Sequence, residues 1–361
     1  MIRNIGRKKK DPETTPVSAE KPWFVFQWHI TDACDQRCKH CYIYGENPQK
    51  TPESTSPEDL ARILDKCLAF CSQRSLRPSF CVTGGDPLLH PDFWPFITLL
   101  HQVGAPFTIM GNPFHLTADV CKRLKKLGCR QYQMSIDGLE KTHDLLRRPG
   151  SYRETMEKIA LLNRTGLPSA VMTTVSRMNM EELPEIIREM AKANVGLYAF
   201  SRYCPTGPEK EVGIEPAEYR QLLKTCAETI RSLQQEGCKT RFGKKDHLWT
   251  LYDYEEGRFH IPEKAETGIV HGGCHCGISH LTILPNGDVY ACRRVLNSKI
   301  GNIFRDNLSE LWAGPMRQYR EYSRFEKCAS CELMPWCRGC PAVAGARNGN
   351  FYAPDPQCWK E

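Results

Sequence analysis

The distribution of cysteine residues constrains this chain more than any other feature of its sequence. Of its 361 residues 19 are cysteines; three of these occur within eight residues, and eight more fall between residues 274 and 358. The chain has no apolar run of about 18 residues and no apolar segment after its basic N-terminus, so we expect neither a membrane span nor a secretory signal. Grouped cysteines in a cytoplasmic protein indicate metal ligation or redox chemistry rather than disulfides. The sequence therefore predicts a cytoplasmic, metal-dependent protein.

The composition excludes several other classes of protein. Apolar residues make up 40% of the chain and charged residues 25%, which rules out a collagen, a coiled-coil rod or a wholly disordered chain. The formal net charge is +7, but basic residues are concentrated only at residues 7–10. A nucleic-acid-binding surface needs a dense basic stripe. We therefore expect no nucleic-acid partner.

Six strand–helix repeats follow a polar segment at residues 1–22, which we expect to be a flexible tail. The predicted strands are 23–30, 79–83, 107–110, 131–136, 170–175 and 197–202. The predicted helices are 57–70, 93–102, 118–127, 152–165, 180–193 and 216–235. Strands that alternate with helices form a parallel sheet, so residues 23–207 predict an α/β fold with a partial (β/α)6 TIM-like barrel. A helical linker over 208–268 and a cysteine-rich, metal-organised domain over 269–361 complete the predicted organisation.

The first cysteine group has the spacing C-x3-C-x2-C, with Cys34, Cys38 and Cys41 as its members. Three thiolates in one short loop leave one iron of a 4Fe–4S cluster without a protein ligand. Such an open coordination position is typical of catalytic metal sites, whereas closed sites are usually structural. The alternative is a zinc knuckle whose fourth ligand is His40 or another residue.

This loop, placed after a first strand, resembles that of the radical S-adenosylmethionine (radical SAM) superfamily. The sequence Gly84-Gly85-Asp86-Pro87 is similar to the family's Gly-Gly-Glu-Pro motif, with an acid one methylene shorter, and 135–138 is similar to its Ser-x-Asp-Gly motif. The resemblance implies that the glycine motif holds the methionine amino group of SAM, that His40 lies near the adenine, and that the serine and a following arginine contact the ribose or carboxylate. The implied cofactor-binding residues are His40, Gly84, Gly85, Asp86, Pro87, Ser135, Asp137 and Arg147.

The second cysteine group resembles the SPASM extension of radical SAM enzymes in the order and spacing of its members. A predicted hairpin over 281–290 with an Asn-Gly turn places Cys292 on the returning strand. The resemblance implies two auxiliary 4Fe–4S clusters. Auxiliary cluster I would be held by Cys274, Cys276, Cys292 and Cys340, and auxiliary cluster II by Cys328, Cys331, Cys337 and Cys358. One alternative leaves Cys274 or Cys276 as a free thiol beside an accessible iron.

Two other classes of protein remain as alternatives at this point. One is a zinc ribbon with two structural zinc sites that binds nucleic acid, which would need basic and aromatic residues interleaved with the cysteines. The other is a plain electron-transfer protein, which would need neither a SAM pocket nor a six-repeat barrel.

The resemblance implies a reaction as well as a fold. SAM bound to a reduced cluster would be cleaved to a 5′-deoxyadenosyl radical, which abstracts a hydrogen atom from a peptide or protein. The expected outcome is maturation of a ribosomal peptide by a thioether, a crosslink or epimerisation; the alternative is oxidation of a sulfatase residue to formylglycine. The implied cofactors are SAM and three 4Fe–4S clusters, and the implied electron donor is a flavodoxin or ferredoxin.

Two further positions are candidates for catalysis. Cys204 follows the sixth predicted strand at the expected mouth of the barrel, where a thiol would donate a hydrogen atom or hold a substrate intermediate; the alternative is a small packing residue. Formylglycine formation would need a carboxylate base from the C-terminal half. Asp246, Asp253 and Asp288 could each serve, and the sequence does not distinguish them. We take Asp288 as the predicted catalytic residue.

Overall fold

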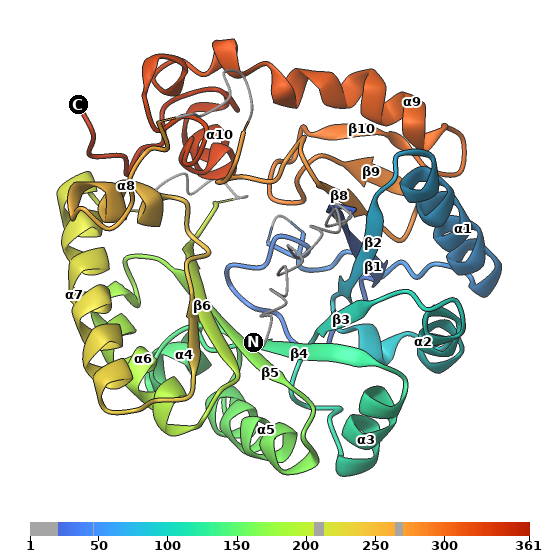
Figure 1. Cartoon of the computed structure of the whole chain (residues 1–361). Coiled ribbons are helices and arrows are strands. Elements are labelled where there is room, and N and C mark those ends of the chain that lie inside the picture. Colours follow the sequence, from blue (N-terminus) through green and yellow to red (C-terminus); the bar gives the residue numbers. More distant parts are fainter. Residues whose placement is uncertain (1–20, 46, 206–212, 264–269) are drawn as a thin grey trace, which may run out of the picture.

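The chain is built on one ten-stranded sheet, seen in a computed structural model that describes residues 21–45, 47–205, 213–263 and 270–361. The strand order is β10-β9-β8-β1-β2-β3-β4-β5-β6-β7. The strands form an inner ring and the helices lie outside it (Figure 1). Of the predicted tail, only residues 21 and 22 belong to the described part of the chain. The predicted α/β partial barrel is confirmed.

The strands are β1 (Trp23–Thr31), β2 (Arg77–Gly84), β3 (Phe107–Met110), β4 (Cys129–Ser135), β5 (Ser169–Val175), β6 (Leu197–Arg202), β7 (Arg241–Gly243), β8 (His280–Ile283), β9 (Asp288–Tyr290) and β10 (Lys299–Asn302). The helices are α1 (Pro57–Gln73), α2 (Phe93–Gln102), α3 (Ala118–Lys126), α4 (Glu140–Leu146), α5 (Ser151–Thr165), α6 (Leu183–Lys192), α7 (Pro216–Gln235), α8 (Leu248–Glu255), α9 (Leu308–Ala313) and α10 (Pro341–Asn348). Short 3-10 turns include η1 (Pro87–Leu89) and η2 (Met180–Glu182).

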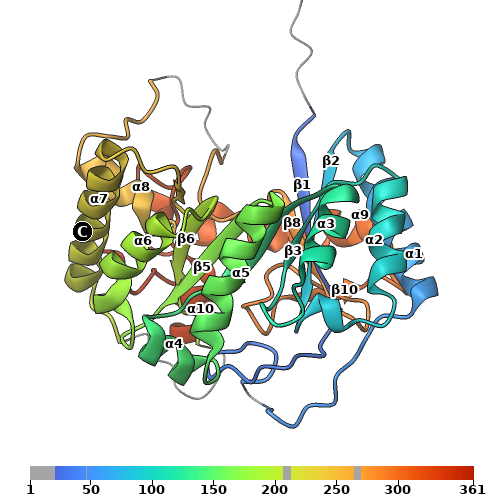
Figure 2. The ribbon, with the colours of Figure 1, turned by 90° about the horizontal axis from the view of Figure 1, so that it is seen from below.

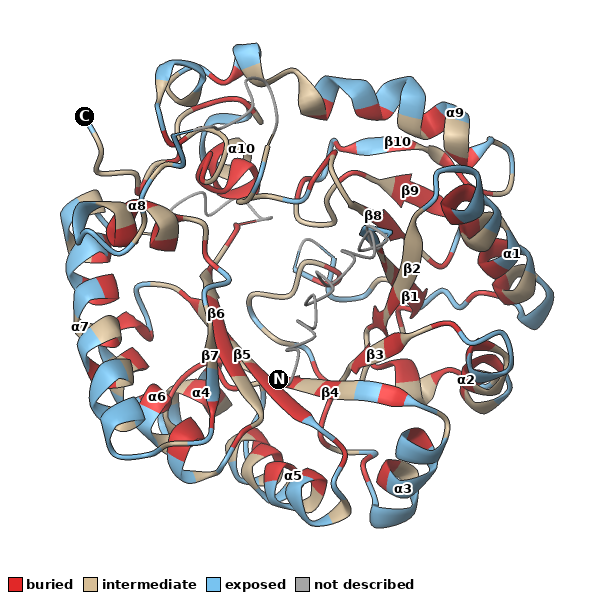
Figure 3. Cartoon of the chain, viewed as in Figure 1, coloured by how far each residue is buried: buried red, intermediate tan, exposed pale blue. Residues whose placement is uncertain are grey.

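The hydrophobic core lies between the sheet and its covering helices. Alternate residues of β1 point to the helices, and Phe24, Phe26 and Trp28 are fully buried there. The ring of Phe24 packs edge-on against Phe70 of α1, with 5.0 Å between the ring centroids. Helix α1 begins at a serine cap and a proline, which together satisfy or remove the first free N–H groups. Buried residues accordingly follow the strands and the inner faces of the helices (Figure 3).

The six predicted strands are all present, and each neighbouring pair from β1 to β6 is parallel. Their carboxyl ends therefore meet at one edge of the sheet, where the chemistry of parallel α/β folds resides. The predicted helix at 180–193 is wrong at its start: residues 180–182 form the turn η2, and α6 begins at Leu183. Pro184 explains the boundary, because proline has no N–H and fits only the first turn of an α-helix.

The sheet continues beyond the six expected strands at both edges. At one edge β7, from the segment 208–268, pairs in parallel with β6. At the other edge β8 pairs in parallel with β1, and β9 pairs antiparallel with both β8 and β10. The predicted hairpin is thus confirmed. Cys292 lies two residues beyond the end of β9 rather than on it, because its carbonyl accepts a bond from Val295 N–H and begins a turn.

The C-terminal cysteine-rich segment lies on the open side of the barrel. It contacts α8 on one flank, where the Thr250 hydroxyl donates to the Trp336 carbonyl. It joins the sheet through β8 on the other flank. A view turned by 90° shows α7 at one flank of the curved sheet and α1 and α2 at the opposite flank (Figure 2). Within the described parts of the chain, no helix has the length and apolarity needed to cross a membrane.

Candidate active site

A cavity of about 280 Å³ opens at the carboxyl ends of the strands. It is lined by the loop after β1 and by the ends of β2 to β6. Among its lining residues are the predicted site residues Cys34, Cys38, Cys41, His40, Gly84, Gly85, Ser135, Arg147 and Cys204. The structure therefore brings together three motifs that lie far apart in the sequence. Asp86, Pro87 and Asp137 are not among the residues that line this cavity.

The sulfurs of the first cysteine group are surrounded by hydrogen-bond donors. The Cys34 sulfur accepts from Asn112 Nδ2 at 3.3 Å and from the Gln36 N–H at 3.5 Å. Arg147 Nη1 lies 3.8 Å from the Cys38 sulfur. Donors of this kind fix and tune metal-bound thiolates. Burial raises the pKa of the Cys38 thiol to about 11, so a bound metal would have to displace its proton.

The two glycines of the second motif allow a close approach between loops. A Cβ on Gly84 would lie 1.9 Å from the Thr31 carbonyl oxygen, and one on Gly85 would lie 2.3 Å from that of Ala33. The Gly85 N–H donates to the Thr31 carbonyl at 2.9 Å. Gly84 also has a φ of +148°, which favours glycine. The glycine pair thus lets the end of β2 pack directly on the cysteine loop, in addition to lining the cavity.

Asp86 is fully buried at the start of η1, which Pro87 opens. One of its carboxylate oxygens accepts from the Leu88 N–H at 3.2 Å, while the buried Oδ2 has no partner. Burial raises the pKa of this carboxyl to about 7. A buried acceptor without a donor is unusual in a folded protein. An ammonium group is a donor that such an oxygen would accept, but Asp86 does not line the cavity, so its contact with the methionine amino group stays a prediction.

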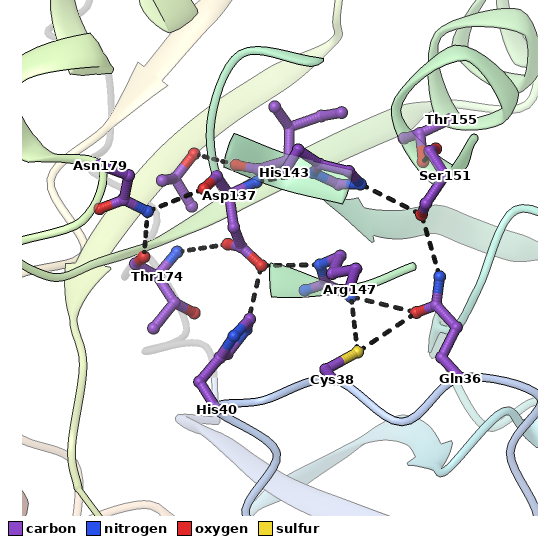
Figure 4. A network of polar contacts seen from close by, with 12 residues as sticks. Gln36, Cys38, His40, Asp137, His143, Arg147, Ser151, Thr155, Thr174 and Asn179 are labelled. Carbon is purple, nitrogen blue, oxygen red and sulfur yellow. Dashed lines mark hydrogen bonds and ion pairs between the residues drawn. The ribbon is translucent and has the colours of Figure 1, made fainter. Parts of the chain in front are cut away.

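Asp137 holds two cavity-lining side chains in place (Figure 4). Its Oδ2 accepts from Arg147 Nε at 2.7 Å and pairs with His40 Nε2 at 3.0 Å. Its Oδ1 accepts from the Thr174 N–H at 2.8 Å. Burial acts to raise the pKa of Asp137, but the charges of Arg147 and His40 outweigh it and hold that pKa well below its usual range. Asp137 is therefore an ionised positioning residue for Arg147 and His40.

A second set of contacts ties this network to the cysteine loop (Figure 4). His143 Nδ1 accepts the Asp137 N–H at 3.0 Å, so its Nε2 carries the proton and donates to the Ser151 hydroxyl at 3.1 Å. Gln36 Nε2 donates to the same hydroxyl at 3.0 Å. Burial, followed by the charge of Arg147, lowers the pKa of His143 to about 4 and keeps it neutral.

Four of these partners, Gln36, Asn112, His143 and Ser151, have no predicted role in the sequence motifs. Gln36 lies inside the cysteine motif and His143 lies close to the Ser-x-Asp-Gly motif, so a role for both residues in the site could have been predicted from their positions. Nothing in the sequence marks Asn112, which reaches Cys34 only because β3 ends beside the cysteine loop.

The C-terminal cysteines form two groups. Cys328, Cys331, Cys337 and Cys358 line one small cavity, as the proposed ligands of one cluster should. In the other group the Cys276 N–H donates to the Cys274 sulfur at 3.5 Å, and Cys340 is buried with its N–H bonded to Asp355. No three cysteine sulfurs in the described parts of the chain lie within 4.8 Å of one another.

The three candidate carboxylates are all ion-paired, and none of them lines the cavity. Asp246 pairs with Arg202 at 2.9 Å. Asp253 pairs with Lys244 and with Arg258, and Asp288 pairs with Lys299. Among the described residues that line the cavity, none of these three aspartates occurs. The structure therefore does not bring a carboxylate base from this set to the cysteine loop.

Comparison with known proteins agrees with this geometry. The radical SAM superfamily model matches residues 28–190, and the SPASM iron–sulfur cluster-binding domain model matches residues 274–341. The AdoMet-dependent heme synthase of Methanosarcina barkeri is 27% identical, with 92% of this chain and 95% of that protein covered. The mycofactocin maturase MftC of Mycolicibacterium smegmatis is also 27% identical, with 92% of this chain and 81% of that protein covered.

Two solved structures share the fold. SuiB of Streptococcus suis bound to S-adenosylmethionine superposes with a TM-score of 0.73 at 18% identity, covering 94% of this chain and 78% of that one. The structure of anSMEcpe with bound AdoMet also superposes with a TM-score of 0.73. It is 16% identical, and the match covers 92% of this chain and 94% of that one. The two family models, over residues 28–190 and 274–341, place the chain among the radical SAM enzymes. More particularly, the chain is a radical SAM enzyme of the SPASM-domain type.

Proposed function

We propose that this enzyme cleaves SAM reductively and removes a hydrogen atom from a peptide or protein substrate. The observation that carries the proposal is the convergence of the cysteine loop, Arg147, His40 and Cys204 on one cavity. SAM bound at a reduced 4Fe–4S cluster supplies a 5′-deoxyadenosyl radical. Cys34, Cys38 and Cys41 would hold that cluster and leave one iron for SAM. The two C-terminal cysteine groups would hold auxiliary clusters, giving three in all, and a flavodoxin or ferredoxin would supply the electron.

The chain's own residues would bind and orient the cofactor. Arg147 presents a guanidinium to the cavity, which suits the carboxylate and hydroxyl groups of SAM. Ser135 lines the same cavity. Asp137 fixes the arginine from behind, so that little side-chain freedom is lost when the cofactor binds. The protein's part in the reaction is therefore placement and exclusion of side reactions.

The peptide substrate is favoured by the relatives that share the fold. MftC is a maturase by name. SuiB bound to its precursor peptide SuiA superposes with a TM-score of 0.72, and anSMEcpe with bound Cp18Cys peptide with 0.70. Formylglycine formation is less supported, because the three candidate base carboxylates are ion-paired and do not line the cavity.

A tetrapyrrole substrate is the second candidate. It is favoured by the heme synthase of Methanosarcina barkeri, which matches nearly its whole length, and by the Fe-coproporphyrin III synthase of the same organism at 24% identity. Both candidates use the same radical and differ only in what enters the cavity.

The deciding experiment measures 5′-deoxyadenosine released by the anaerobically reconstituted enzyme with SAM and dithionite. Peptides encoded beside the gene are compared with an iron porphyrin, and the Cys34→Ala variant serves as the inactive control. Stimulation and mass change with a peptide support the proposal. Stimulation by the porphyrin alone would replace it with the second candidate.

A further inference from the structure

The loop that carries the first cysteine group has two different sides. Its residues 34, 36, 38 and 40 line the cavity, whereas the described residues 35, 37 and 39 are not among the lining residues. Arg37 and Lys39 are exposed to solvent. The two arginines that follow α4 divide in the same way, because Arg147 lines the cavity while Arg148 is exposed and does not line it. Basic side chains therefore cover the side of the loop that faces away from the cavity.

We propose that this outer basic surface, formed by Arg37, Lys39 and Arg148, docks an acidic carrier protein that delivers single electrons to the first cysteine group. The inference rests on the proposed function, which places a cluster at that group. The step moves one electron: the carrier is oxidised by one electron, the cluster is reduced by one, and no bond forms or breaks. A carrier with an acidic surface is the partner whose charge complements the outer basic surface.

Arg37 is held against the backbone of the cysteine loop. Its Nη1 donates to the Cys34 carbonyl at 2.7 Å and to the Gln36 carbonyl at 2.8 Å. Its guanidinium also lies over the ring of Tyr44, at 4.1 Å from the ring centroid, which is a favourable cation–π distance. The positive charge of Arg37 is thus fixed beside a residue whose sulfur would bind the cluster.

Arg148 and Lys39 are joined to the same loop from the α4 side. Arg148 Nη1 donates to the Asp35 carbonyl at 3.2 Å, and its guanidinium lies 3.7 Å from the ring centroid of Phe114. The Lys39 N–H donates to the carbonyl of Leu146, the last residue of α4, at 2.9 Å. The three basic residues therefore belong to one surface, although the sequence places Arg148 more than a hundred residues after the other two.

The charges of the outer basic surface are available to a partner. Within the described ranges of the chain, no ion pair involves Arg37, Lys39 or Arg148. The carboxylate of Asp35 lies in the same loop, but it is bound by His115 at 3.1 Å and by the Asn112 amide at 2.8 Å. Exposed charges of one sign that have no internal partner raise the rate of encounter with a protein of the opposite sign.

The position of the surface distinguishes an electron carrier from a substrate. A substrate has to enter the cavity, and the outer basic surface does not line it. A carrier needs only to come close to the cluster, because electron transfer slows steeply with distance. Figure 2 shows the loop after β1, in blue, at the end of the barrel beside α4, where a second protein can approach it from outside.

The test compares two charge-reversal variants of the reconstituted full chain. Lys39→Glu with Arg148→Glu alters the outer basic surface, and Arg37 is kept because it also supports the loop. Lys224→Glu with Lys239→Glu, at exposed positions in and after α7, is the control and changes the net charge by the same amount.

The probes are a purified flavodoxin and a purified ferredoxin. Binding of each oxidised probe is measured by calorimetry at low and high salt. The second measurement is 5′-deoxyadenosine formation driven either by the reduced probe or by dithionite, a small reductant that needs no docking site.

We expect the Kd of the probe to rise by about 10-fold in Lys39→Glu with Arg148→Glu at low salt, and the difference to shrink at high salt. The probe-driven rate falls with it, whereas the dithionite-driven rate, the iron content and the control variant do not change. Lys39→Arg with Arg148→Lys, which keeps both charges, binds the probe as the wild type does.

Equal Kd values for the wild type and Lys39→Glu with Arg148→Glu would overturn this inference alone, and so would a wild type that binds neither probe. A lost dithionite-driven rate in that variant would also overturn it, because these residues would then serve SAM or the substrate. A wild type that forms no 5′-deoxyadenosine with dithionite would overturn the proposed function as well.

Discussion

Arg202 and Asp355 lie 153 residues apart in the sequence and meet in a buried two-point ion pair. The arginine also pairs with Asp246, so one cation lies between two carboxylates at the end of β6. Gln357 contributes its side-chain oxygen to the same guanidinium at 2.9 Å. This cluster fastens the barrel to the C-terminal cysteine domain, and it fixes the relative position of the two cysteine groups.

Arg202→Met should destabilise the protein strongly. Removing the arginine leaves two buried carboxylates without a cation, which costs about 3–5 kcal/mol. The measurement is the denaturant midpoint of the reconstituted enzyme. Arg188→Met is the control, because Arg188 pairs with Glu185 on the surface and such pairs contribute about 0–1 kcal/mol. Equal midpoints for the two variants would contradict the assigned role of Arg202.

Asp137→Asn should weaken SAM cleavage without loss of iron. The variant removes the charge that holds Arg147 and His40 against the cavity. Changes in such supporting contacts typically cost about 10–100-fold, and we expect a loss of that size in 5′-deoxyadenosine formation, with a raised KM for SAM. Asp119→Asn, at an exposed helix position, is the control. Wild-type kinetics in Asp137→Asn would show that Arg147 needs no such support.

Gly84→Ala should prevent assembly of the cysteine loop. Its Cβ would lie 1.9 Å from a backbone oxygen of Thr31, so the end of β2 could not reach β1. We expect most of the iron bound by the loop to be lost, measured as iron per purified chain. Gly104→Ala is the control for replacing a glycine that has a positive φ, because an added Cβ at Gly104 would have no atom within 4 Å. Full iron content in Gly84→Ala would refute the close approach.

Asp86 should make the apo-protein less stable as the pH rises. Burial raises its pKa from 3.8 to about 7. The folded state therefore binds its proton more tightly than the unfolded state, and the stability this supplies is full below pH 3.8 and is lost as the pH rises through about 7. Denaturant midpoints at pH 5 and pH 8 measure the effect. Asp86→Asn should flatten this dependence, and an unchanged slope in the variant would rule Asp86 out as its source.

The parts of the fold that were predictable have strong local signals. Helix α7 matches its predicted range because Pro216 and a long apolar periodicity mark it. Strand β7 has only three residues and carries no periodic signal, so its place at the sheet edge depends on β6. The pairing of β8 with β1 could not be predicted from the sequence either, because it depends on contacts between distant segments.

The site likewise contains residues that could be predicted from the sequence and residues that could not. The cysteines were predictable because ligand spacing within one loop is a local property. Asn112 lies 78 residues from Cys34, and no motif joins them. The sequence predicted Asp288 as a catalytic base, but in the structure Lys299 from the neighbouring strand forms an ion pair with it. Partners that the tertiary fold supplies cannot be read from spacing alone.

We propose that this chain holds three iron–sulfur clusters around a SAM-cleaving site. The most direct test is the iron, sulfide and zinc content per chain after anaerobic reconstitution. The account predicts about twelve irons with matching sulfide and little zinc, and about eight irons when Cys34, Cys38 and Cys41 are all replaced by alanine. About four irons with bound zinc, or zinc alone, would contradict it.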